Sequence, residues 1–488
     1  MVIKMEFYDR GAELEILEAS AKTKKGELVS IYGPRRIGKS MLINKFFDGK
    51  VYAYYQATYD SIDSQLKMLS ASIGRAIKND ILADHGAADW MSLFRFVAEY
   101  KGDEKFLISI DEFPRLAKLM PSLPSILQSV WDQYMSKSNI MLILCGSSIS
   151  MMKSEVLSYS APLYGRSSLV IKLEPMRFVD IVQFISNFDF IDKLYAYFVF
   201  GGIPAYYVQA GSQNSFRDML RYVISAGDTF YSEISLQLSE DVRSDAKFIE
   251  VLTLIAEGIN KPSEIASKAH IQQSNLYYYL DVLQEIGLVA KEFPFLEEPK
   301  IRSKKSSYVV KSQFAMFWAV VLRRVRDAAA HADANAYESA LILTESLAQK
   351  QFEVFALQFI YTVSNKKAFG FGIDKAGRWW GRDTSKPRAK DQEEIDVVAV
   401  NENTKDILFA ECKWTSAKVG VDLYTDLKRK ARLVKWHNDV RKEHFALFSK
   451  AGFTEEMEEL AKKEHVLLFG LKGIEDALKE CYPGRILR

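Results

Sequence analysis

Short apolar runs alternate with amphipathic stretches over about the first 175 residues. Runs typical of buried strands lie at 28–32, 51–55, 106–110 and 140–144, and helical patterns separate them. Apolar strands that alternate with helices are typical of a parallel sheet covered by helices on both faces. The pattern therefore predicts an α/β domain over residues 1–175.

The pattern changes twice further along the chain. Helical periodicity from 176 to 240 predicts a helical lid or coupling segment. Residues 241–330 then hold three short helical runs and a strand-like pair at 289–294 and 307–310, which is the order of elements in a winged helix-turn-helix.

The third helix of a winged helix-turn-helix enters the DNA major groove, and its first residues reach base edges. Here it opens with Gln272, Gln273 and Asn275, which are suitable types for that contact, and Tyr277–Tyr279 follow. The same pattern also fits a protein-binding spacer whose tyrosines lie in the core, so both interpretations stay open.

A last α/β domain is expected over 337–488, after a connector at 327–336. Its strands and helices alternate differently from those of the first domain, with a long helix first and three strands in succession. The predicted elements are a helix at 344–363, strands near 367–371, 394–400 and 408–413, a helix at 420–438 and a strand at 445–448.

The strand at 28–32 leads into GPRRIGKS, which fits the pattern G-x-x-x-x-G-K-[ST]. Glycines let such a loop curl so that backbone N–H groups point at phosphate oxygens, and the following helix adds its positive N-terminus. Lys39 is expected to reach the β and γ phosphates, and Ser40 to bind Mg²⁺. The sequence therefore predicts ATP and Mg²⁺ as cofactors. The residues expected to bind the nucleotide are Gly33, Pro34, Arg35, Arg36, Ile37, Gly38, Lys39 and Ser40.

A strand that ends in Asp111-Glu112 supplies the acidic element that a phosphate loop needs. Asp111 is expected near the magnesium ion, and Glu112 is expected to polarise the attacking water. Ser147 ends another strand, where a polar sensor of the γ-phosphate fits, and Arg166 offers a charge that can neutralise the transition state. A purely structural role fits Ser147 and Arg166 equally well.

The segments FYDR, GPRRIGKS, ISIDEF, CGSS, LYGR and GGIP occur in this order between about residues 5 and 235. As a set they resemble the archaeal AAA-type ATPase family, which belongs with the signal-transduction ATPases with numerous domains. The resemblance implies that Ser147 is a sensor and Arg166 an arginine finger or sensor. It also implies that Gly202 and Pro204 couple the nucleotide state to the helical segment.

A second set of candidate catalytic residues lies in the last domain. Antiparallel pairing of two predicted strands would place Asp396 beside Glu411, and Lys413 shares a strand face with Glu411. Carboxylates suit Mg²⁺ or Mn²⁺, and the metal with Lys413 can activate a water and stabilise a phosphate under attack. Glu353 on the preceding helix is expected to complete the metal-binding group, with Lys413 as a catalytic residue.

The spacing D-x(14)-E-x-K resembles the restriction-endonuclease-like fold of PD-(D/E)xK nucleases. It resembles more closely a domain of unknown function that is fused to the archaeal ATPases, which GRWWGR at 377–382 also fits. The resemblance covers about 344–470 and implies metal-dependent DNA cleavage. Ile395 precedes Asp396 where the motif has a proline, and a catalytically silent fold that only binds stays open.

Composition narrows the expected setting. Three widely spaced cysteines favour a reducing compartment, and no apolar run is long enough to span a bilayer, so a cytoplasmic protein without a membrane partner is expected. The net charge is only +2, so affinity for DNA must come from local basic stretches, at 300–326, 366–391 and 422–442. If Arg166 acts across a subunit interface, the protein is a homo-oligomer.

Three functions fit these patterns. The first is an ATP-gated, Mg²⁺-dependent DNA-processing protein that cleaves DNA. The second is an ATP-dependent switch that binds DNA or a protein partner through a silent nuclease-like domain. The third is an ATP-dependent transcription regulator that uses only the winged helix.

Overall fold

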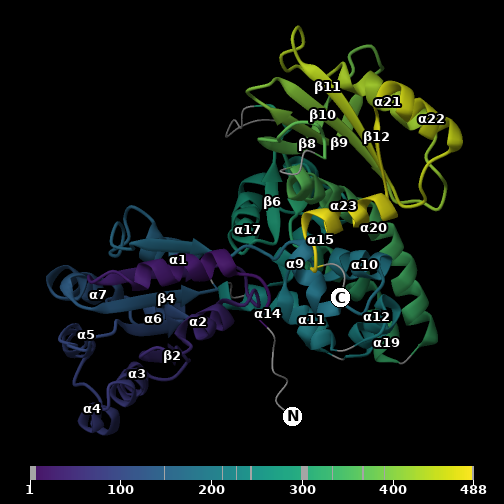
Figure 1. Ribbon diagram of the computed structural model, residues 1–488. Helices are drawn as coiled ribbons and strands as arrows, with labels where there is room; N and C mark the ends of the chain where they lie inside the picture. Colours follow the sequence, from purple (N-terminus) through teal and green to yellow (C-terminus); the bar gives the residue numbers. More distant parts are fainter. Residues whose placement is uncertain are drawn as a thin grey trace. The chain divides into compact units, whose positions relative to one another are not determined.

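The computed structural model describes residues 7–147, 149–211, 213–226, 228–241, 245–297, 306–331, 333–364, 368–388 and 391–485. The chain divides into two compact units (Figure 1). Unit 1 comprises Met1–Met176 with two short additions, Ile203–Ala205 and Glu240–Val242. Unit 2 comprises Arg177–Gly202, Tyr206–Ser239 and Arg243–Arg488.

Unit 1 is built on a five-stranded parallel sheet, which confirms the α/β prediction. The strand order is β2-β3-β4-β1-β5, so β4 lies between β1 and β3. The carboxyl ends of β1, β3 and β4 therefore meet at one edge of the sheet. The strands are β1 (Glu27–Tyr32), β2 (Tyr52–Gln56), β3 (Phe106–Asp111), β4 (Ile140–Gly146) and β5 (Leu169–Lys172).

Helices cover both faces of this sheet, because its central strands are apolar on both sides. Leu17 of α1 and Phe46 of α2 pack on one face, and Leu69 of α3, Trp90 of α5 and Leu127 of α7 pack on the other. The helices are α1 (Gly11–Ala21), α2 (Lys39–Phe47), α3 (Ile62–Ala76), α4 (Asp80–His85), α5 (Trp90–Ala98), α6 (Phe113–Leu119), α7 (Leu123–Gln133) and α8 (Ile149–Met152).

Unit 2 begins with a helical part whose centre is aromatic. Phe200 stacks on Phe230, and Tyr206 stacks on Phe314, with ring centroids 5.8 and 4.3 Å apart. Stacked rings of this kind bury large apolar areas. The helices here are α9 (Phe178–Ile181), α10 (Phe190–Phe200), α11 (Pro204–Ala210), α12 (Phe216–Ser225), α13 (Asp228–Tyr231), α14 (Glu233–Asp241), α18 (Gln313–Phe317) and α19 (Arg323–Ala330).

Three short helices and an antiparallel strand pair follow α14 in the chain. Leu276, Leu280 and Leu283 of the third helix are buried, and its other residues are exposed or half-buried. The elements are α15 (Ala246–Ala256), α16 (Pro262–Lys268), α17 (Gln273–Glu285), β6 (Val289–Glu292) and β7 (Ser307–Val310).

The C-terminal part of unit 2 is a mixed five-stranded sheet of order β12-β11-β10-β9-β8 (Figure 1). Strands β8, β9 and β10 are antiparallel, and β10, β11 and β12 are parallel. Tyr424 of α21 and Met457 of α22 pack on one face, and Phe352 and Phe359 of α20 contact Phe448 of β11 on the other. The elements are α20 (Ala334–Ser364), β8 (Lys375–Arg382), β9 (Gln392–Asn401), β10 (Asp406–Lys413), α21 (Val421–Ala431), β11 (Lys442–Ser449), α22 (Glu455–Glu464), β12 (Leu467–Gly470) and α23 (Leu471–Cys481).

Three predicted boundaries in this part were wrong. Residues 368–371 form turns because Gly370 adopts a φ of +79°, and the strand begins at Lys375; Lys367 lies outside the described residues. The helix predicted at 420–438 ends at Ala431, where the Arg441 guanidinium donates to the Ala431 and Val434 carbonyls.

The third wrong boundary is the connector predicted at 327–336. Its alanine-rich sequence has high helix propensity, so α19 continues to Ala330, and α20 begins at Ala334, well before the start of the helix predicted at 344–363. The predicted connector is therefore largely helical.

Candidate functional site

The loop after β1 has the tight backbone that phosphate binding requires. Gly38 has a φ of +95°, and Arg36 also lies in the left-handed region. A Cβ on Gly33 would stand 2.4 Å from the Leu173 carbonyl oxygen, so only glycine fits there. The Lys39 ammonium donates to the Gly33 and Pro34 carbonyls at 3.0 and 2.9 Å, which holds its charge inside the loop.

Asp111 ends β3 beside this loop, as predicted from its place in the sequence. Its Oδ2 accepts hydrogen bonds from Ser40 Oγ at 2.5 Å and from Tyr54 OH at 2.6 Å. Burial raises the pKa of Asp111, but the Ser40 and Tyr54 hydrogen bonds outweigh it and hold the pKa below its usual value. The structure thus joins an ionised carboxylate and a hydroxyl, the donor set that Mg²⁺ accepts in phosphate loops.

Tyr54 was not predicted from the sequence. It lies on β2, next to β3 in the sheet, and both burial and the neighbouring Asp111 carboxylate raise its pKa. The phenol therefore stays protonated and acts as a donor. A tyrosine-rich strand, YAYY, was the only signal in the sequence, and it does not reveal which strand β2 adjoins.

Glu112 and Ser147 face each other across two neighbouring strand ends. Ser147 Oγ, after β4, donates to both Glu112 carboxylate oxygens at 3.0 and 3.2 Å. Glu112 has a left-handed φ of +53°, a strained conformation for a non-glycine residue, and such strain is concentrated at functional sites. The predicted sensor and the predicted base are therefore brought together.

Arg166 has a structural partner. Its guanidinium makes two hydrogen bonds to the carboxylate of Asp132 on α7, at 2.8 and 2.7 Å. It also donates to the Pro162 and Tyr164 carbonyls. The structure thus places Arg166 on Asp132, and its action on a phosphate stays a prediction.

Asp396 of β9 and Glu411 of β10 lie next to each other in the C-terminal sheet, and an irregularity of the sheet falls at Asp396. The pairing of β8 with β9 shifts between Gly377 and Trp379, so that Arg378 alone stands opposite Asp396 and Val397. Such a bulge bends a strand and re-aims its side chains. Asp396 Oδ2 accepts a hydrogen bond from the Cys412 backbone N–H at 2.9 Å.

Negative charges crowd Asp396. Burial, then Glu411 and then Glu353 raise its pKa well above the usual value. Burial also raises the pKa of Glu353, and Gln349 donates to it at 3.0 Å. The arrangement favours a cation, because a bound cation would offset this repulsion.

Lys430 was expected on a basic surface, yet its ammonium contacts Glu411 Oε1 at 2.8 Å. Lys430 and Glu411 are 15% and 4% exposed, so the pair is largely buried. Over the described residues, no three His, Cys, Asp or Glu side chains gather into a ready metal-binding group. Asp396 and Glu411 remain as two neighbouring carboxylates, and Mg²⁺ in proteins commonly uses one or two. Lys413 lies at the end of β10 and lowers the pKa of Asp396.

The start of α17 is open to solvent. Gln272, Gln273 and Asn275 are exposed, as are Tyr277 and Tyr278. Tyr278 also contacts Phe248 edge-on, with centroids 5.8 Å apart. The interpretation that places all three tyrosines in the core is therefore wrong for Tyr277 and Tyr278.

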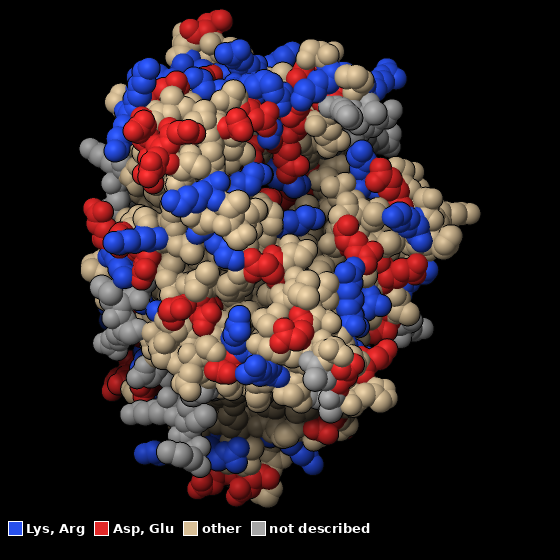
Figure 2. Space-filling model, turned by 90° about the vertical axis from the view of Figure 1, so that its right-hand side faces the viewer, with Lys and Arg blue, Asp and Glu red and all other residues tan. Residues whose placement is uncertain are grey.

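The predicted basic surfaces are largely neutralised within the chain. Figure 2 shows Lys and Arg side chains intermixed with Asp and Glu on one face of the molecule. Lys428 pairs with Glu464, and Arg429 pairs with Asp383, Glu393 and Asp426. Other pairs are Arg324–Glu257, Arg326–Asp228, Lys375–Glu402, Arg378–Glu394 and Lys386–Glu393. The basic residues at 300–305, 366–367 and 390 lie outside the described residues.

The parallel sheet, the phosphate loop and the Ser40–Asp111 pair define unit 1 as a P-loop ATPase domain. A family model described as "ATPase domain predominantly from Archaea" matches residues 7–210. A second model, described as "Archaea bacterial proteins of unknown function", matches residues 317–425.

An uncharacterised protein of Methanocaldococcus jannaschii is 30% identical over 438 residues, which cover 88% of this chain and 92% of that protein. An uncharacterised ATP-binding protein of the same organism is 48% identical over 44 residues, 9% of this chain and 75% of that protein. The Walker-type ATPase of Pyrococcus abyssi has a similar fold, with a TM-score of 0.51 and 19% identity over 64% of this chain and 96% of that chain.

The chain belongs to the archaeal ATPase family and joins its ATPase domain to a C-terminal domain of unknown function. This membership supports ATP binding and hydrolysis with Mg²⁺. Among the helices that the structure describes, none combines the length and the apolar character needed to cross a membrane.

Proposed function

We propose that this protein uses ATP binding and hydrolysis to control DNA binding and Mg²⁺-dependent DNA cleavage by its C-terminal domain. The observation that carries the proposal is the position of Asp396. This half-buried carboxylate lies beside the buried Glu411 and the half-buried Glu353, and Lys413 is close enough to lower its pKa. Buried like charges are costly in a purely structural site, and a cation with a phosphate would make use of them.

The ATPase reaction would take place at the edge of the unit 1 sheet. Lys39 and the loop N–H groups would bind the phosphates, and Ser40 with Asp111 would hold Mg²⁺, which supplies charge neutralisation when bound. Glu112, oriented by the hydroxyl of Ser147, would accept the proton of the attacking water as ADP and phosphate form. Because Ser147 contacts Glu112 directly, loss of the γ-phosphate would change the positions of the residues that follow β3 and β4 together.

DNA cleavage would take place where β9 and β10 adjoin. Asp396 and Glu411 would hold the metal, which supplies Lewis-acid chemistry when bound. Lys413 would stabilise the charge that develops on the attacked phosphate. Glu353, held by Gln349, would complete the acidic environment as a positioning group.

The elements α15 to β7 support a winged helix as the duplex-binding part. Gln273 and Asn275 are exposed at the first turn of α17, where a recognition helix meets base edges. Tyr277 is exposed one turn further on and would contact the DNA backbone.

The test is a nuclease assay with single-stranded, duplex and branched DNA, with Mg²⁺ or Mn²⁺, with and without ATP. Cleavage by the unaltered protein that is lost in Asp396→Ala and in Lys413→Ala, while both variants keep ATPase activity, would support the proposal. Cleavage that survives in either variant would contradict the assignment of the site.

The Lys430–Glu411 ion pair favours a second candidate function. In it, the C-terminal domain is a silent, ATP-controlled docking surface for DNA or a protein partner, and Lys430 takes the place of a metal. Calorimetric titration with Mn²⁺ separates the two functions. Binding that Glu411→Gln removes supports the nuclease, whereas no binding, together with intact ATPase activity, supports the switch.

A further inference from the structure

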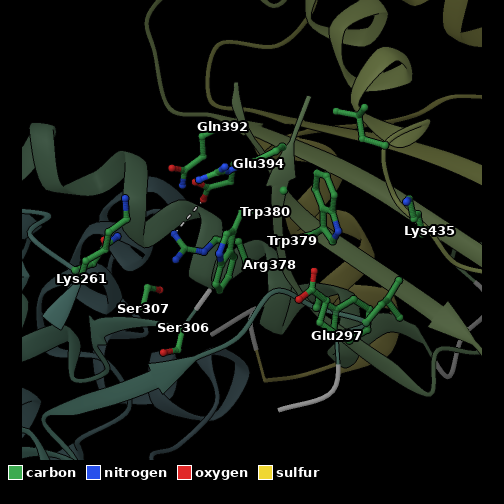
Figure 3. A pocket seen from close by; sticks show the side chains of 16 residues that line it. Lys261, Glu297, Ser306, Ser307, Arg378, Trp379, Trp380, Gln392, Glu394 and Lys435 are labelled. Carbon is green, nitrogen blue, oxygen red and sulfur yellow. Dashed lines mark hydrogen bonds and ion pairs between the residues drawn. The ribbon is translucent and has the colours of Figure 1, made fainter. Parts of the chain in front are cut away.

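A cavity of about 540 Å³ lies in unit 2 beside β8, the edge strand of the C-terminal sheet (Figure 3). The sequence GRWWGR, which the proposed reaction leaves without a role, provides one wall. The opposite wall comes from the segments around β6 and β7. The lining includes Lys261, Phe295, Arg378, Trp379, Trp380 and Glu394. A volume of this size is typical of sites for small ligands.

The wall provided by GRWWGR is a rigid aromatic and cationic surface. The Arg378 guanidinium lies over the Trp380 ring, 5.1 Å from its centroid. Two carboxylates hold Arg378 in place, Glu394 at 3.0 Å (Figure 3) and Glu292 at 3.1 Å. Trp379 also lines the cavity, and because its side chain is buried in the core of the sheet it fixes the strand. An indole and a guanidinium plane are the two surfaces on which nucleobases stack.

The rim of the cavity carries three exposed cations and one exposed carboxylate, Glu297. Two of the cations pair with acids, Lys261 with Glu264 at 3.8 Å and Arg382 with Asp391 at 3.7 Å. Lys261, Arg382 and Lys435 are all exposed at its edge, and Gln392 offers an amide for hydrogen bonds. Exposed cations around a stacking surface are the usual way to bind the sugar–phosphate backbone of a single strand.

The cavity adjoins the proposed cleavage site. Glu394 precedes Asp396 by two residues on β9, and Arg378 stands opposite Asp396 at the bulge. Glu353, a member of the acidic group, interacts electrostatically with both Glu394 and Arg378. A strand whose phosphate lies at Asp396 would therefore have a neighbouring nucleotide at the cavity.

We propose that this cavity binds one unpaired nucleotide of a DNA strand, with its base stacked against Trp380 and Arg378 and its phosphates near Lys261 and Lys435. This deepens, and rests on, the proposed nuclease function, because it assigns single-stranded or locally opened DNA as the substrate. A paired base is already stacked on both faces, so it enters such a cavity only after leaving the helix, which costs free energy that a single strand does not pay.

The test measures binding rather than cleavage. A fluorescein-labelled 12-nucleotide oligo(dT) and a blunt 12-base-pair duplex are titrated by fluorescence polarisation in EDTA. The variants are Trp380→Ala, Trp380→Phe and Lys435→Glu, each checked for folding by its thermal melt. Tyr134→Ala is the matched control, because Tyr134 is an exposed ring facing Arg95 in unit 1. A third arm uses dTMP as a competitor.

Stacking of one base changes affinity by roughly five- to a hundredfold on alanine substitution. We expect Trp380→Ala to weaken oligo(dT) binding by at least about fivefold, and Trp380→Phe, which keeps a stacking ring, to weaken it less. Lys435→Glu should also weaken it, whereas Tyr134→Ala should not.

The inference would be overturned if Trp380→Ala bound oligo(dT) as tightly as the unaltered protein does. It would also be overturned if Trp380→Ala weakened binding of the duplex as much as binding of oligo(dT). Competition by dTMP as strong as by oligo(dT) would overturn the assignment to a DNA strand and indicate a site for free nucleotides. Trp380-dependent binding in a protein that does not cleave any DNA would refute only the nuclease proposal, so the two failures are distinguishable.

Discussion

Replacing Lys430 by methionine removes the ion pair with Glu411, which most directly affects the proposed metal site. It also removes a contact with Asp426 at 3.2 Å, but Asp426 keeps its pair with Arg429 at 2.7 Å. Lys430 contacts Glu411 at 2.8 Å, and the two side chains are 15% and 4% exposed. The substitution keeps most of the apolar stem but leaves the Glu411 carboxylate buried without its cation. Removing one partner of a buried ion pair typically costs about 3–5 kcal/mol, because the remaining charge stays desolvated.

The expected consequence is a lower melting temperature for the unit that contains α21. A loss of about 3–5 kcal/mol lowers Tm by roughly 6–20 °C in a domain of 150–250 residues. The control is Lys428→Met on the same helix, whose pair with Glu464 is 41% and 35% exposed. Exposed pairs contribute about 0–1 kcal/mol, so this variant should melt within a few degrees of the unaltered protein.

Divalent metal should reverse the effect if Asp396 and Glu411 bind it. Mg²⁺ or Mn²⁺ at about a hundred times its dissociation constant would restore about 2.7 kcal/mol in Lys430→Met. Adding Glu411→Gln to Lys430→Met should restore stability without metal and abolish the response to metal. Scanning calorimetry with and without Mn²⁺ measures all of these. Equal, small losses in Lys430→Met and Lys428→Met would refute the assignment of Lys430–Glu411 as a buried pair.

Three further predictions concern both sites. Lys39→Ala should abolish nucleotide binding, which titration with a fluorescent ATP analogue measures. Glu112→Gln should keep nucleotide binding but lower ATP turnover, measured as phosphate release, by about 10²–10⁴-fold. Arg166→Ala and Asp132→Asn break the same ion pair. Equal ATPase rates in the two variants would show that Arg166 has a structural role. A loss of about 10³-fold or more in Arg166→Ala alone would show that Arg166 acts in hydrolysis. In metal-free buffer, Asp396→Asn should match or exceed the stability of the unaltered protein at pH 7. The pKa of Asp396 is raised in the folded state, so the contribution of this carboxyl to the free energy of unfolding is present at low pH and is lost as the pH rises through that pKa. The free energies of unfolding of Asp396→Asn and of the unaltered protein should therefore approach each other as the pH falls. Denaturation curves at several pH values measure this.

Much of the ATPase site was predictable because its parts are contiguous. GPRRIGKS sets its own backbone path through Gly33 and Gly38, and the strand before it and the helix after it are visible in the apolar pattern. Asp111 ends a strand that is buried along its whole length and Glu112 follows it, which places both acids at the sheet edge. These features depend on local geometry, which the order of residue types encodes directly.

The strand boundaries of the C-terminal domain were less predictable. Phe369 and Phe371 suggested a strand, but Gly370 turns the chain there, and both rings pack individually, on Phe469 and His444. A short apolar run shows that side chains are buried, and it does not distinguish a strand from a packed turn.

The sequence by itself determined the α/β class of the first domain, the phosphate loop and the presence of a second acidic group around Asp396. Only the tertiary structure decided that β4 lies between β1 and β3, which brings Ser147 to Glu112. It also decided that Lys430 neutralises Glu411. The physical reason is that motif chemistry is encoded in consecutive residues, whereas the pairing of charges distant in sequence depends on strand order, a bulge and helix packing that no local pattern records.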